Sequence, residues 1–233
     1  MRINKFIAQS GVCSRRKADE LIEKGEVKVN DKVLFSPGYD VKSNDKVEVS
    51  GKVINKSENL VYFMLNKPKG IICSSSDEKG RKTAVDLIKT NERIFCVGRL
   101  DYDSEGLILL TNDGELAYNL THPSKEIPKT YIVKIKGEIK ESELAVLRNG
   151  VKIKDVKYNK CKINVLEKTK DFTKLEIVLT EGKNREIRRM FEFIGKEITL
   201  LKRNKLADLK LGSLNRGEYR ELRDYEVEYL KNL

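Results

Sequence analysis

Three acidic residues, Asp101, Asp103 and Glu105, lie within a five-residue segment between two apolar runs. Carboxylates can bind a metal ion, act as a paired acid and base, or attack a carbon atom as a nucleophile. The chain carries a formal net charge of +11, so this acidic segment is opposite in sign to the chain as a whole. We therefore treat the segment as the candidate site of chemistry.

A calcium loop is the first alternative, because such a loop has oxygen ligands at positions 1, 3 and 5, followed by a glycine. The three acids and Gly106 fit this half of the pattern, but position 12 is Asn112 instead of a glutamate, and an apolar run follows Gly106. A paired-carboxylate hydrolase lacks an identifiable second acid elsewhere, and the positive charge suits a nucleic acid better than a glycan. The third alternative is a single nucleophilic aspartate that an arginine keeps ionised.

The composition narrows the class of protein. Of the 233 residues, 39% are hydrophobic and 36% are charged, which allows a folded core, and the excess of cations favours a polyanionic partner. We expect a cytoplasmic protein, since the sequence has no run of roughly 18 apolar residues for a membrane span and no secretory signal pattern. We also expect reduced thiols and no metal site, because His122 is the only histidine and the cysteines have no close sequence partner: Cys13, Cys73, Cys96 and Cys161.

The first 50 residues predict a compact basic module. Periodicity predicts two helices, one over residues 3–10 and a second that Ser14 caps and Gly25 ends. Residues 27–33 predict a strand, a tight turn and a second strand, and residues 45–49 a third strand. Cations at residues 15–17 oppose the dipole of the second helix. A bound anion explains them better than a local contact does, although a solvated charged face remains the alternative.

The rest of the chain predicts a larger α+β domain. Residues 50–59 are polar and aperiodic, so we place a linker there, with domains at residues 1–58 and 59–233. The expected strands cover residues 60–66, 71–73, 94–97, 106–111, 129–136, 160–167, 174–179, 199–203 and 207–211. The expected helices cover residues 84–88, 115–120, 141–148, 185–194 and 224 onwards. We predict an α+β protein in which a small α/β module precedes a mixed, mainly antiparallel sheet with flanking helices.

An arginine-rich helix is predicted after residue 184. Asn184 is its expected cap and Gly195 its expected end. One apolar face consists of Ile187, Met190, Phe191 and Ile194. Three arginines accompany it: Arg185, Arg188 and Arg189. Arg188 lies next to the apolar face and is the arginine best placed to point inward.

Four segments resemble, in the same order, the bacterial ribosomal-RNA pseudouridine synthases: Lys67 to Gly70, Gly98 to Leu107, Lys129 to Tyr131, and Glu181 to Met190. The chain is most similar to the group that modifies large-subunit RNA and carries an amino-terminal RNA-binding module. That module resembles a domain first seen in a small-subunit ribosomal protein, over residues 2–8, 14–22 and 25–32.

The resemblance implies an aspartate nucleophile, Asp101, acting on a flipped-out uridine. Tyr131 would stack on the uracil, Arg188 would pair with Asp101 and keep it ionised, and Ile187 would pack beside this pair. The reaction breaks the N1 glycosidic bond, turns the uracil and joins C5 to the sugar, without a cofactor or a metal. Whether Asp101 attacks the sugar, attacks the pyrimidine or abstracts a proton stays open.

The resemblance also implies where RNA binds. In the small module, the expected phosphate contacts are Lys5, Arg15, Arg16, Lys17 and Lys28. In the larger domain they are Lys67, Arg99, Arg185 and Arg189. Solvation is the alternative for Lys67, and bracing of the acidic loop is the alternative for Arg99.

Several neighbouring positions carry weaker expectations. Asp103 and Glu105 are expected to face solvent or to cap backbone amides. Arg185 stands where some relatives have histidine, and Glu186 where glutamine is common; we expect these differences to affect RNA contacts more than chemistry.

We predict a monomeric enzyme that isomerises uridine in ribosomal RNA, namely in 23S RNA or a large-subunit assembly intermediate. The alternatives are a synthase that acts on 16S RNA and a non-catalytic assembly factor. The presence of Asp101, Tyr131 and Arg188 in their motifs argues against the latter.

Overall fold

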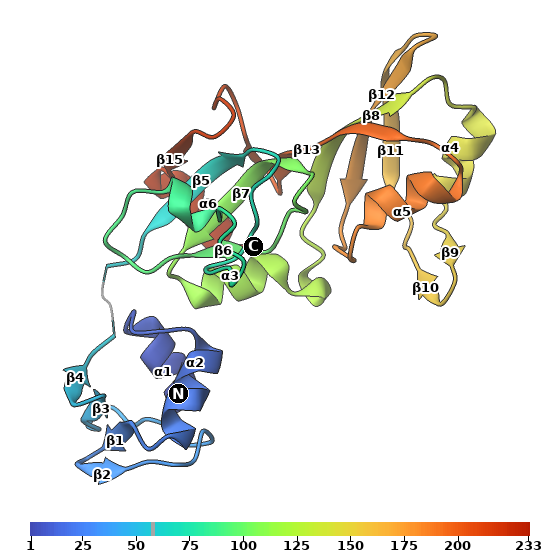
Figure 1. Ribbon diagram of the computed structural model, residues 1–233. Coiled ribbons are helices and arrows are strands. Elements are labelled where there is room, and N and C mark those ends of the chain that lie inside the picture. The colour runs from blue at the N-terminus through green and yellow to red at the C-terminus, as the bar shows by residue number, and fades with distance from the viewer. Residues whose placement is uncertain (57–58) are drawn as a thin grey trace. The chain divides into compact units, whose positions relative to one another are not determined.

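The computed structural model describes residues 1–56 and 59–233, and the chain divides into two compact units (Figure 1). The first comprises residues 1–61, 90–94 and 112–114, and the second comprises residues 62–89, 95–111 and 115–233. The predicted domain boundary after residue 58 falls outside the described residues. The predicted α+β class is confirmed in both units.

The amino-terminal unit packs two helices against a small sheet. Its elements are α1 (Ile3–Gln9), α2 (Arg15–Glu23), β1 (Val27–Val29), β2 (Lys32–Val33), β3 (Val47–Val49) and β4 (Lys52–Ile54). The four strands are antiparallel in the order β2-β1-β3-β4. The predicted cap is confirmed, because the side chain of Ser14 accepts a hydrogen bond from the backbone amide of Lys17 at 3.2 Å. Gly25 follows the helix with φ +72°, which permits the chain to reverse direction.

The linker prediction was wrong for its first half. Residues 52–54 form β4, which pairs with β3 through a two-residue turn at Ser50 and Gly51. Both turn residues have positive φ, +46° and +79°, the conformation that a tight hairpin requires. The strand is short and largely exposed, so it lacks the apolar alternation by which a strand is recognised. The second half of the predicted linker includes residues 57 and 58, which lie outside the described residues.

The larger unit is built on a nine-stranded sheet. Its strands are β5 (Tyr62–Lys67), β6 (Phe95–Val97), β7 (Glu105–Thr111), β8 (Lys129–Lys136), β11 (Lys162–Lys168), β12 (Phe172–Leu179), β13 (Ile198–Leu206), β14 (Leu209–Lys210) and β15 (Tyr219–Glu221). The order is β11-β12-β8-β13-β7-β5-β15, with β14 beside β13 and β6 beside β7. The pair β7–β13 is parallel and the other described pairs are antiparallel, which confirms the predicted mainly antiparallel sheet.

The helices of this unit are α3 (Gly114–Thr121), α4 (Glu141–Arg148), α5 (Glu186–Phe193) and α6 (Asp224–Lys231), with 3-10 turns η1 (Val85–Leu87) and η2 (Pro123–Lys125). A short hairpin, β9 (Lys152–Ile153) with β10 (Val156–Lys157), was not predicted. The strand expected at residues 71–73 is wrong, because Ile72 makes only an isolated bridge to Thr83. No described helix has the length and apolarity needed to cross a membrane.

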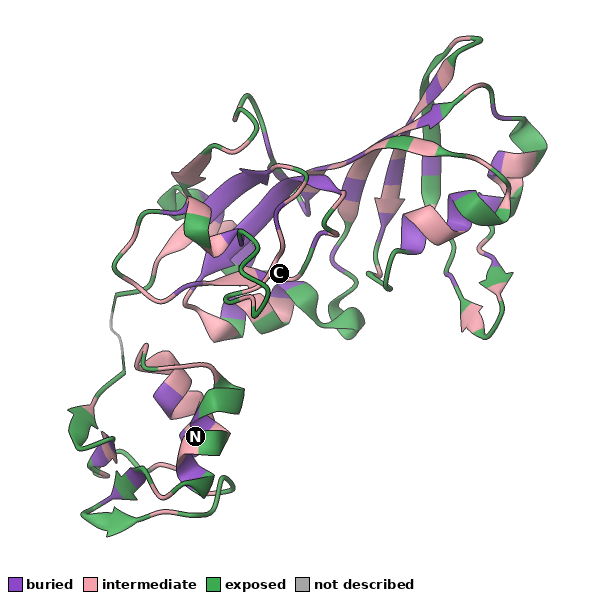
Figure 2. Ribbon diagram, viewed as in Figure 1, coloured by how far each residue is buried: buried purple, intermediate pink, exposed green. Residues whose placement is uncertain are grey.

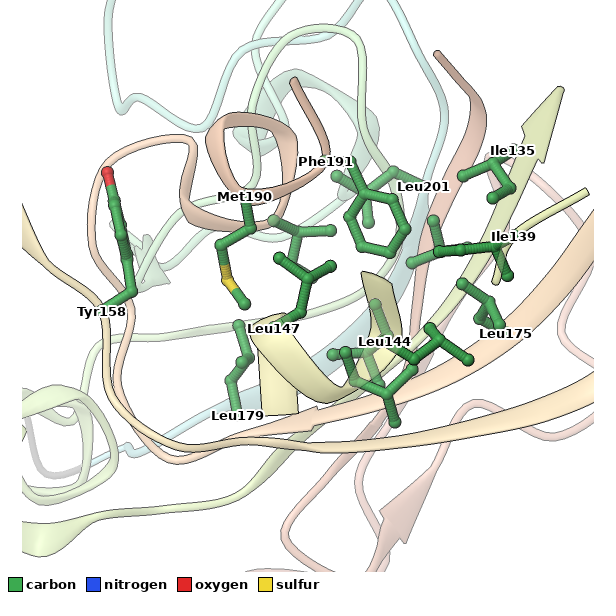
Figure 3. Close-up of a cluster of buried hydrophobic side chains, with 14 of the residues drawn as sticks. Ile135, Ile139, Leu144, Leu147, Tyr158, Leu175, Leu179, Met190, Phe191 and Leu201 are labelled. Carbon is green, nitrogen blue, oxygen red and sulfur yellow. The ribbon is translucent and has the colours of Figure 1, made fainter. Parts of the chain in front are cut away.

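One apolar cluster fixes α4 and α5 to the sheet. Leu144 and Leu147 of α4 and Phe191 of α5 meet Ile135 and Leu175 of the strands (Figure 3). The burial pattern of β12 alternates between buried and half-buried residues along its whole length, as expected for a strand covered on one face. The two helices therefore cover one face of the β11-β12-β8-β13 region, and the opposite side chains keep contact with solvent (Figure 2).

Gly106 permits the close parallel contact of β7 with β13. Its φ is +110°, and a Cβ atom added there would lie 2.1 Å from the carbonyl oxygen of Arg203. Backbone cannot retreat as a flexible side chain can, so any other residue at this position is both sterically blocked and conformationally strained.

Gly106→Ala is therefore expected to lower the free energy of unfolding of the larger unit by about 3 kcal/mol or more, because strain and overcrowding act together. Chemical denaturation would measure the change. Gly114→Ala is the matched control, since nothing lies within 4 Å of a Cβ atom added there and alanine favours the helix. Equal stability of the two variants would contradict the steric argument.

Candidate active site

The acidic loop between β6 and β7 is held in place by its own backbone. The amide of Ser104 donates to the carbonyl of Asp101 at 3.1 Å, and the amide of Gly70 donates to the carbonyl of Tyr102 at 2.8 Å. The amide of Leu100 donates to the Cys73 sulfur at 3.3 Å, and the Leu100 side chain is buried. The loop therefore presents the Asp101 carboxylate, 31% exposed, from a fixed backbone.

Arg188 of α5 reaches this loop from a position 85 residues later in the chain. Its Nη2 atom donates to the backbone oxygen of Asp103 at 3.0 Å and to Ser104 Oγ at 3.3 Å. The same nitrogen lies 3.2 Å from Asp103 Oδ2, and Arg188 Nε lies 4.0 Å from Asp101 Oδ2. The side chain is only 15% exposed. The structure thus brings Arg188 to Asp101, as the sequence suggested, but its shorter contacts are to Asp103 and Ser104.

Asp103 faces solvent, as expected, with its side chain 46% exposed, but it also interacts with two arginines. Besides its contact with Arg188, its carboxylate lies 3.7 Å from Nη1 of Arg185. The Arg185 backbone adopts a left-handed conformation, φ +50°, at the start of α5. This residue, and not Asn184, occupies the cap position, so the predicted cap was wrong. The Asn184 side chain instead accepts a hydrogen bond from Arg189 at 3.0 Å.

Glu105 is also not a loop acid. It begins β7, is buried, and its carboxylate lies 3.2 Å from Arg216. Asp101 and Asp103 share Arg188, whereas Glu105 faces Arg216, so the three carboxylates of the segment do not converge on one common point. This geometry disagrees with a calcium loop. Among the described residues, no group of three or more histidine, cysteine or acidic side chains is arranged to hold a metal ion.

A cavity of about 230 Å³ opens beside Asp101. Tyr131 on β8 lines it, together with Arg99, Arg185 and Ile187. The volume is smaller than the roughly 300–1,000 Å³ typical of sites for drug-sized ligands, so it suits a group with a single ring. The cavity thus collects the acid, the aromatic residue and the arginine-rich helix that the sequence had linked.

Sequence reasoning gave no role to four other residues that line this cavity: Ser104, Leu179, Lys183 and Leu201. In the sequence, Leu179 and Leu201 have the pattern of ordinary core residues of their strands. Residues 181–184 could have been found, because Gly182 and Asn184 mark a loop directly before a helix rich in arginine.

The structure corrects the proposed role of Lys67. The side chain is fully buried, and its ammonium group donates to the carbonyl oxygens of Pro68 at 2.8 Å and Ile71 at 2.7 Å. Burial lowers the pKa of this group. Lys67 therefore fixes the turn that follows β5 and cannot contact RNA in this conformation. Solvation, the alternative considered above, is excluded by the same burial.

The other residues that were expected to contact RNA differ in their exposure to solvent and in their side-chain partners. Arg99 is exposed at the cavity, whereas Arg189 is half-buried and turned towards Asn184. In the small unit, Arg15, Arg16, Lys17 and Lys28 are exposed and Lys5 is half-buried. Lys17 forms an ion pair with Glu20 at 2.8 Å; the hydrogen bond raises the pKa of the lysine. Arg15 and Arg16 remain the most accessible cations of that helix turn.

Two cysteines that are 23 residues apart in the sequence meet below the acidic loop. The thiol of Cys96, on β6, hydrogen bonds to Cys73, and together with the Leu100 amide it lowers the pKa of Cys73 to about 7. The pKa of Cys96 is raised, because it donates to Cys73 and is buried. The cysteines are therefore far apart in the sequence, as expected, but Cys73 and Cys96 are in contact in the structure. All four cysteines are free thiols.

Glu186 is a buried acid at the wall of the cavity, not an RNA-contact position as expected. Burial and a hydrogen bond to Glu181 raise its pKa to about 8. The backbone amide of Lys183 donates to its Oε2 atom at 3.0 Å. A protonated Glu186 has the hydrogen-bonding capacity of glutamine, so it can donate to Glu181 and still accept from Lys183.

Comparison with known proteins gives two family matches. Residues 61–193 match the model described as RNA pseudouridylate synthase, and residues 1–47 match the S4 domain. The first match spans more than half of the chain and includes the acidic loop, Tyr131 and Arg188.

Similar proteins cover the chain from end to end. A relative in Bacillus subtilis, ribosomal large subunit pseudouridine synthase B, is 46% identical over 100% of this chain and 96% of its own length. The dual-specificity RNA pseudouridine synthase RluF of Escherichia coli is 39% identical, over 97% of this chain and 77% of its own. A crystal structure of a pseudouridylate synthase is 30% identical over 99% of both chains, with a TM-score of 0.72.

Replacing the buried acid with its neutral analogue, Glu186→Gln, is expected to raise stability in alkaline solution. Between the usual pKa of 4.5 and the raised value of about 8, the folded protein binds more protons than the unfolded chain. The contribution of Glu186 to stability is therefore full below pH 4.5 and is lost as the pH rises to about 8. We expect the variant to melt about 4 °C or more above the wild type at pH 9, and to match it near pH 4.5.

Thermal melting from pH 4.5 to 9 would measure this difference. Glu192→Gln, at an exposed position of the same helix, is the control and should leave the pH profile unchanged. A constant offset between Glu186→Gln and the wild type at every pH would show that Glu186 does not titrate in this range.

Proposed function

The chain belongs to the RNA pseudouridylate synthase family and converts uridine in RNA to pseudouridine; from this premise, we propose that its substrate is large-subunit ribosomal RNA and that Asp101 is its nucleophile. The substrate follows from the relative in Bacillus subtilis, whose name specifies the large ribosomal subunit and which matches the whole chain. Ribosomal RNA as substrate also places the enzyme in the cytoplasm. The proposed domains are residues 1–58 for RNA binding and 59–233 for catalysis.

The observation that carries the proposal is that Asp101 and Tyr131 line one small cavity, while Arg188 lies beside Asp101, with its Nε atom 4.0 Å from Asp101 Oδ2. Asp101 is the acid of the loop that lines this cavity, whereas Glu105 is buried against Arg216. Tyr131 supplies an aromatic ring beside it, and base recognition outside a nucleic-acid stack commonly uses such a ring. The cavity volume of about 230 Å³ admits one base, so the uridine must leave its stack to reach Asp101.

Arg188 is proposed to hold the acidic loop and to face the Asp101 carboxylate. Its Nη2 atom fixes the backbone at Asp103 and Ser104, while its Nε atom has no hydrogen-bond partner within the described residues and lies 4.0 Å from Asp101. A small rotation of the carboxylate would make that contact. Arginine suits this position because it keeps its charge even when largely buried.

The chemistry balances without a further reactant. The N1 glycosidic bond of the uridine breaks, the uracil turns within the cavity, and C5 bonds to the sugar carbon as the C5 proton is released to solvent and N1 gains a proton. Attack on the sugar, attack on the pyrimidine and proton abstraction each require an ionised carboxylate at the position of Asp101. The cations of the small unit, above all Arg15 and Arg16, would hold the surrounding phosphates.

Asp101→Asn should abolish turnover, with kcat lower by about 10⁴-fold or more, because an amide cannot act as a nucleophile or base. Asp103→Asn is the matched control, since Arg188 keeps its contacts with the Asp103 backbone and Ser104 Oγ. We expect it to lose less than about tenfold in kcat. Single-turnover conversion of a ribosomal RNA fragment would measure both.

Mapping of pseudouridines in cellular ribosomal RNA would identify which RNA is the substrate. Chemical mapping in a strain without the gene should show a missing pseudouridine in large-subunit RNA, restored by the wild type but not by Asp101→Asn. A missing site in 16S RNA alone would overturn the large-subunit assignment. Restoration by Asp101→Asn would falsify the role of Asp101.

Arg188→Ala should lower kcat by about 10²- to 10³-fold, because it removes the cation that positions the loop and the charge beside Asp101, and should change RNA affinity less than about threefold. Arg189→Ala is the control on the same helix, since Arg189 bonds to Asn184 and not to the acidic loop. If Arg188→Ala weakened RNA binding in proportion to its loss of turnover, Arg188 would be a phosphate contact and not a positioning residue.

A further inference from the structure

Over β11, β12, β8 and β13, the sheet of the larger unit has one face that α4 and α5 do not cover. α4 and α5 pack against the face that carries Val133, Leu175 and Leu201. The alternate residues of β8, β11, β12 and β13 point the other way and, apart from the buried Thr130, are half-buried or exposed (Figure 2). We call this second surface the open face. It is separate from the cavity at Asp101, because Tyr131 lines that cavity from the covered side.

Strand register places lysines from several strands on the open face. Lys162 of β11 pairs with Val178, which pairs with Thr130, which in turn pairs with Lys205 of β13. Neighbouring rows add Lys134, Lys174 and Lys202. Four strands at intervals of about 4.8 Å span about 14 Å, so these lysines form a broad surface and not a point site.

The charge of the open face is mostly uncompensated. Lys162, Lys174 and Lys202 form no ion pair in the part of the chain that the structure describes. Lys205 is paired with Asp208 at 2.8 Å. The acid beside Lys202 in the register is Glu105, which already faces Arg216. The acids among the open-face residues of β8, β11 and β12 are Glu176 and Glu167, and Glu167 lies opposite Lys174 in the register.

A hollow of about 500 Å³ lies on this face. Thr130, Glu176 and Val178 line it together with three lysines, Lys202, Lys205 and Lys210. Protein interfaces usually have an apolar, desolvated centre, whereas this hollow combines hydroxyl and amide groups with cations. Such a surface is suited to phosphate oxygens and sugar hydroxyls.

We propose that the open face is a second RNA-binding surface, which holds the phosphate backbone of the ribosomal RNA outside the segment that contains the target uridine. The inference rests on the proposed function, since the occupant is the same RNA. A surface that binds phosphates without base contacts adds affinity and fixes orientation. It therefore favours a long, folded RNA over a short hairpin that fills only the cavity.

The test compares two triple variants with the same loss of charge. Lys162→Gln, Lys174→Gln and Lys202→Gln together remove unpaired cations of the open face. Lys140→Gln, Lys152→Gln and Lys160→Gln are the control; these three lysines are exposed and belong to the segments around α4 and the β9–β10 hairpin. Circular dichroism and melting temperature would verify that both variants are folded.

Fluorescence anisotropy would measure binding of a protein-free large-subunit RNA fragment over a range of salt concentrations. We expect the open-face variant to bind about tenfold or more weakly at low salt, and to lower the slope of log affinity against log salt by about 2 to 3, in line with three lost phosphate contacts. Turnover of a short hairpin around the target uridine should match the wild type.

Each other outcome has a defined meaning. Equal binding by the two triple variants would overturn the open face as an RNA surface. A defect seen only with assembled subunits, and not with protein-free RNA, would assign the face to a ribosomal protein and equally overturn the proposal. Failure of the wild type to modify either RNA would instead reject the proposed substrate, while the binding comparison would still decide the role of the open face.

Discussion

The buried guanidinium of Arg188 is the contact on which the site depends. It joins the β6–β7 loop to α5, two segments 85 residues apart, through one backbone oxygen, one hydroxyl and two carboxylates. A largely buried cation is costly unless its donors find acceptors, so loop and helix stabilise each other's positions. The Asp101 carboxylate is thereby held on a rigid frame, which is what precise chemistry requires.

Close packing behind the loop supports the same arrangement. Gly106 lets β7 approach the backbone of β13, and Lys67 closes the adjacent turn with its ammonium group. Neither residue touches the cavity, yet both fix the strands from which the loop extends. The two faces of the sheet differ in the side chains that they present. The covered face provides the apolar wall and Tyr131 for the cavity, and the open face concentrates cations.

The sequence predicted the elements well where local physics decides them. The boundaries of β8 and α4 match the predicted ranges, because alternation and helical spacing are read directly from side-chain type. It failed at β4, which is too short and exposed to show alternation, and at the cap of α5, where Arg185 takes the left-handed conformation in place of Asn184. The prediction that Lys67 contacts RNA was also wrong, because the residues next to a lysine in the sequence do not show that carbonyl oxygens will surround its ammonium group.

The sequence by itself determined the two-part organisation and the basic character, since composition and periodicity are properties of the linear chain. Its resemblance to a known family singled out Asp101, Tyr131 and Arg188. Only the tertiary structure decided which partner each acid has. Asp103 makes the shortest contact with Arg188, and Glu105 pairs with Arg216. Glu186 is buried, and its pKa is raised. The physical reason is that partner choice and burial depend on segments far apart in sequence. Electrostatic energy depends on those distances and on exclusion of water, neither of which residue order specifies.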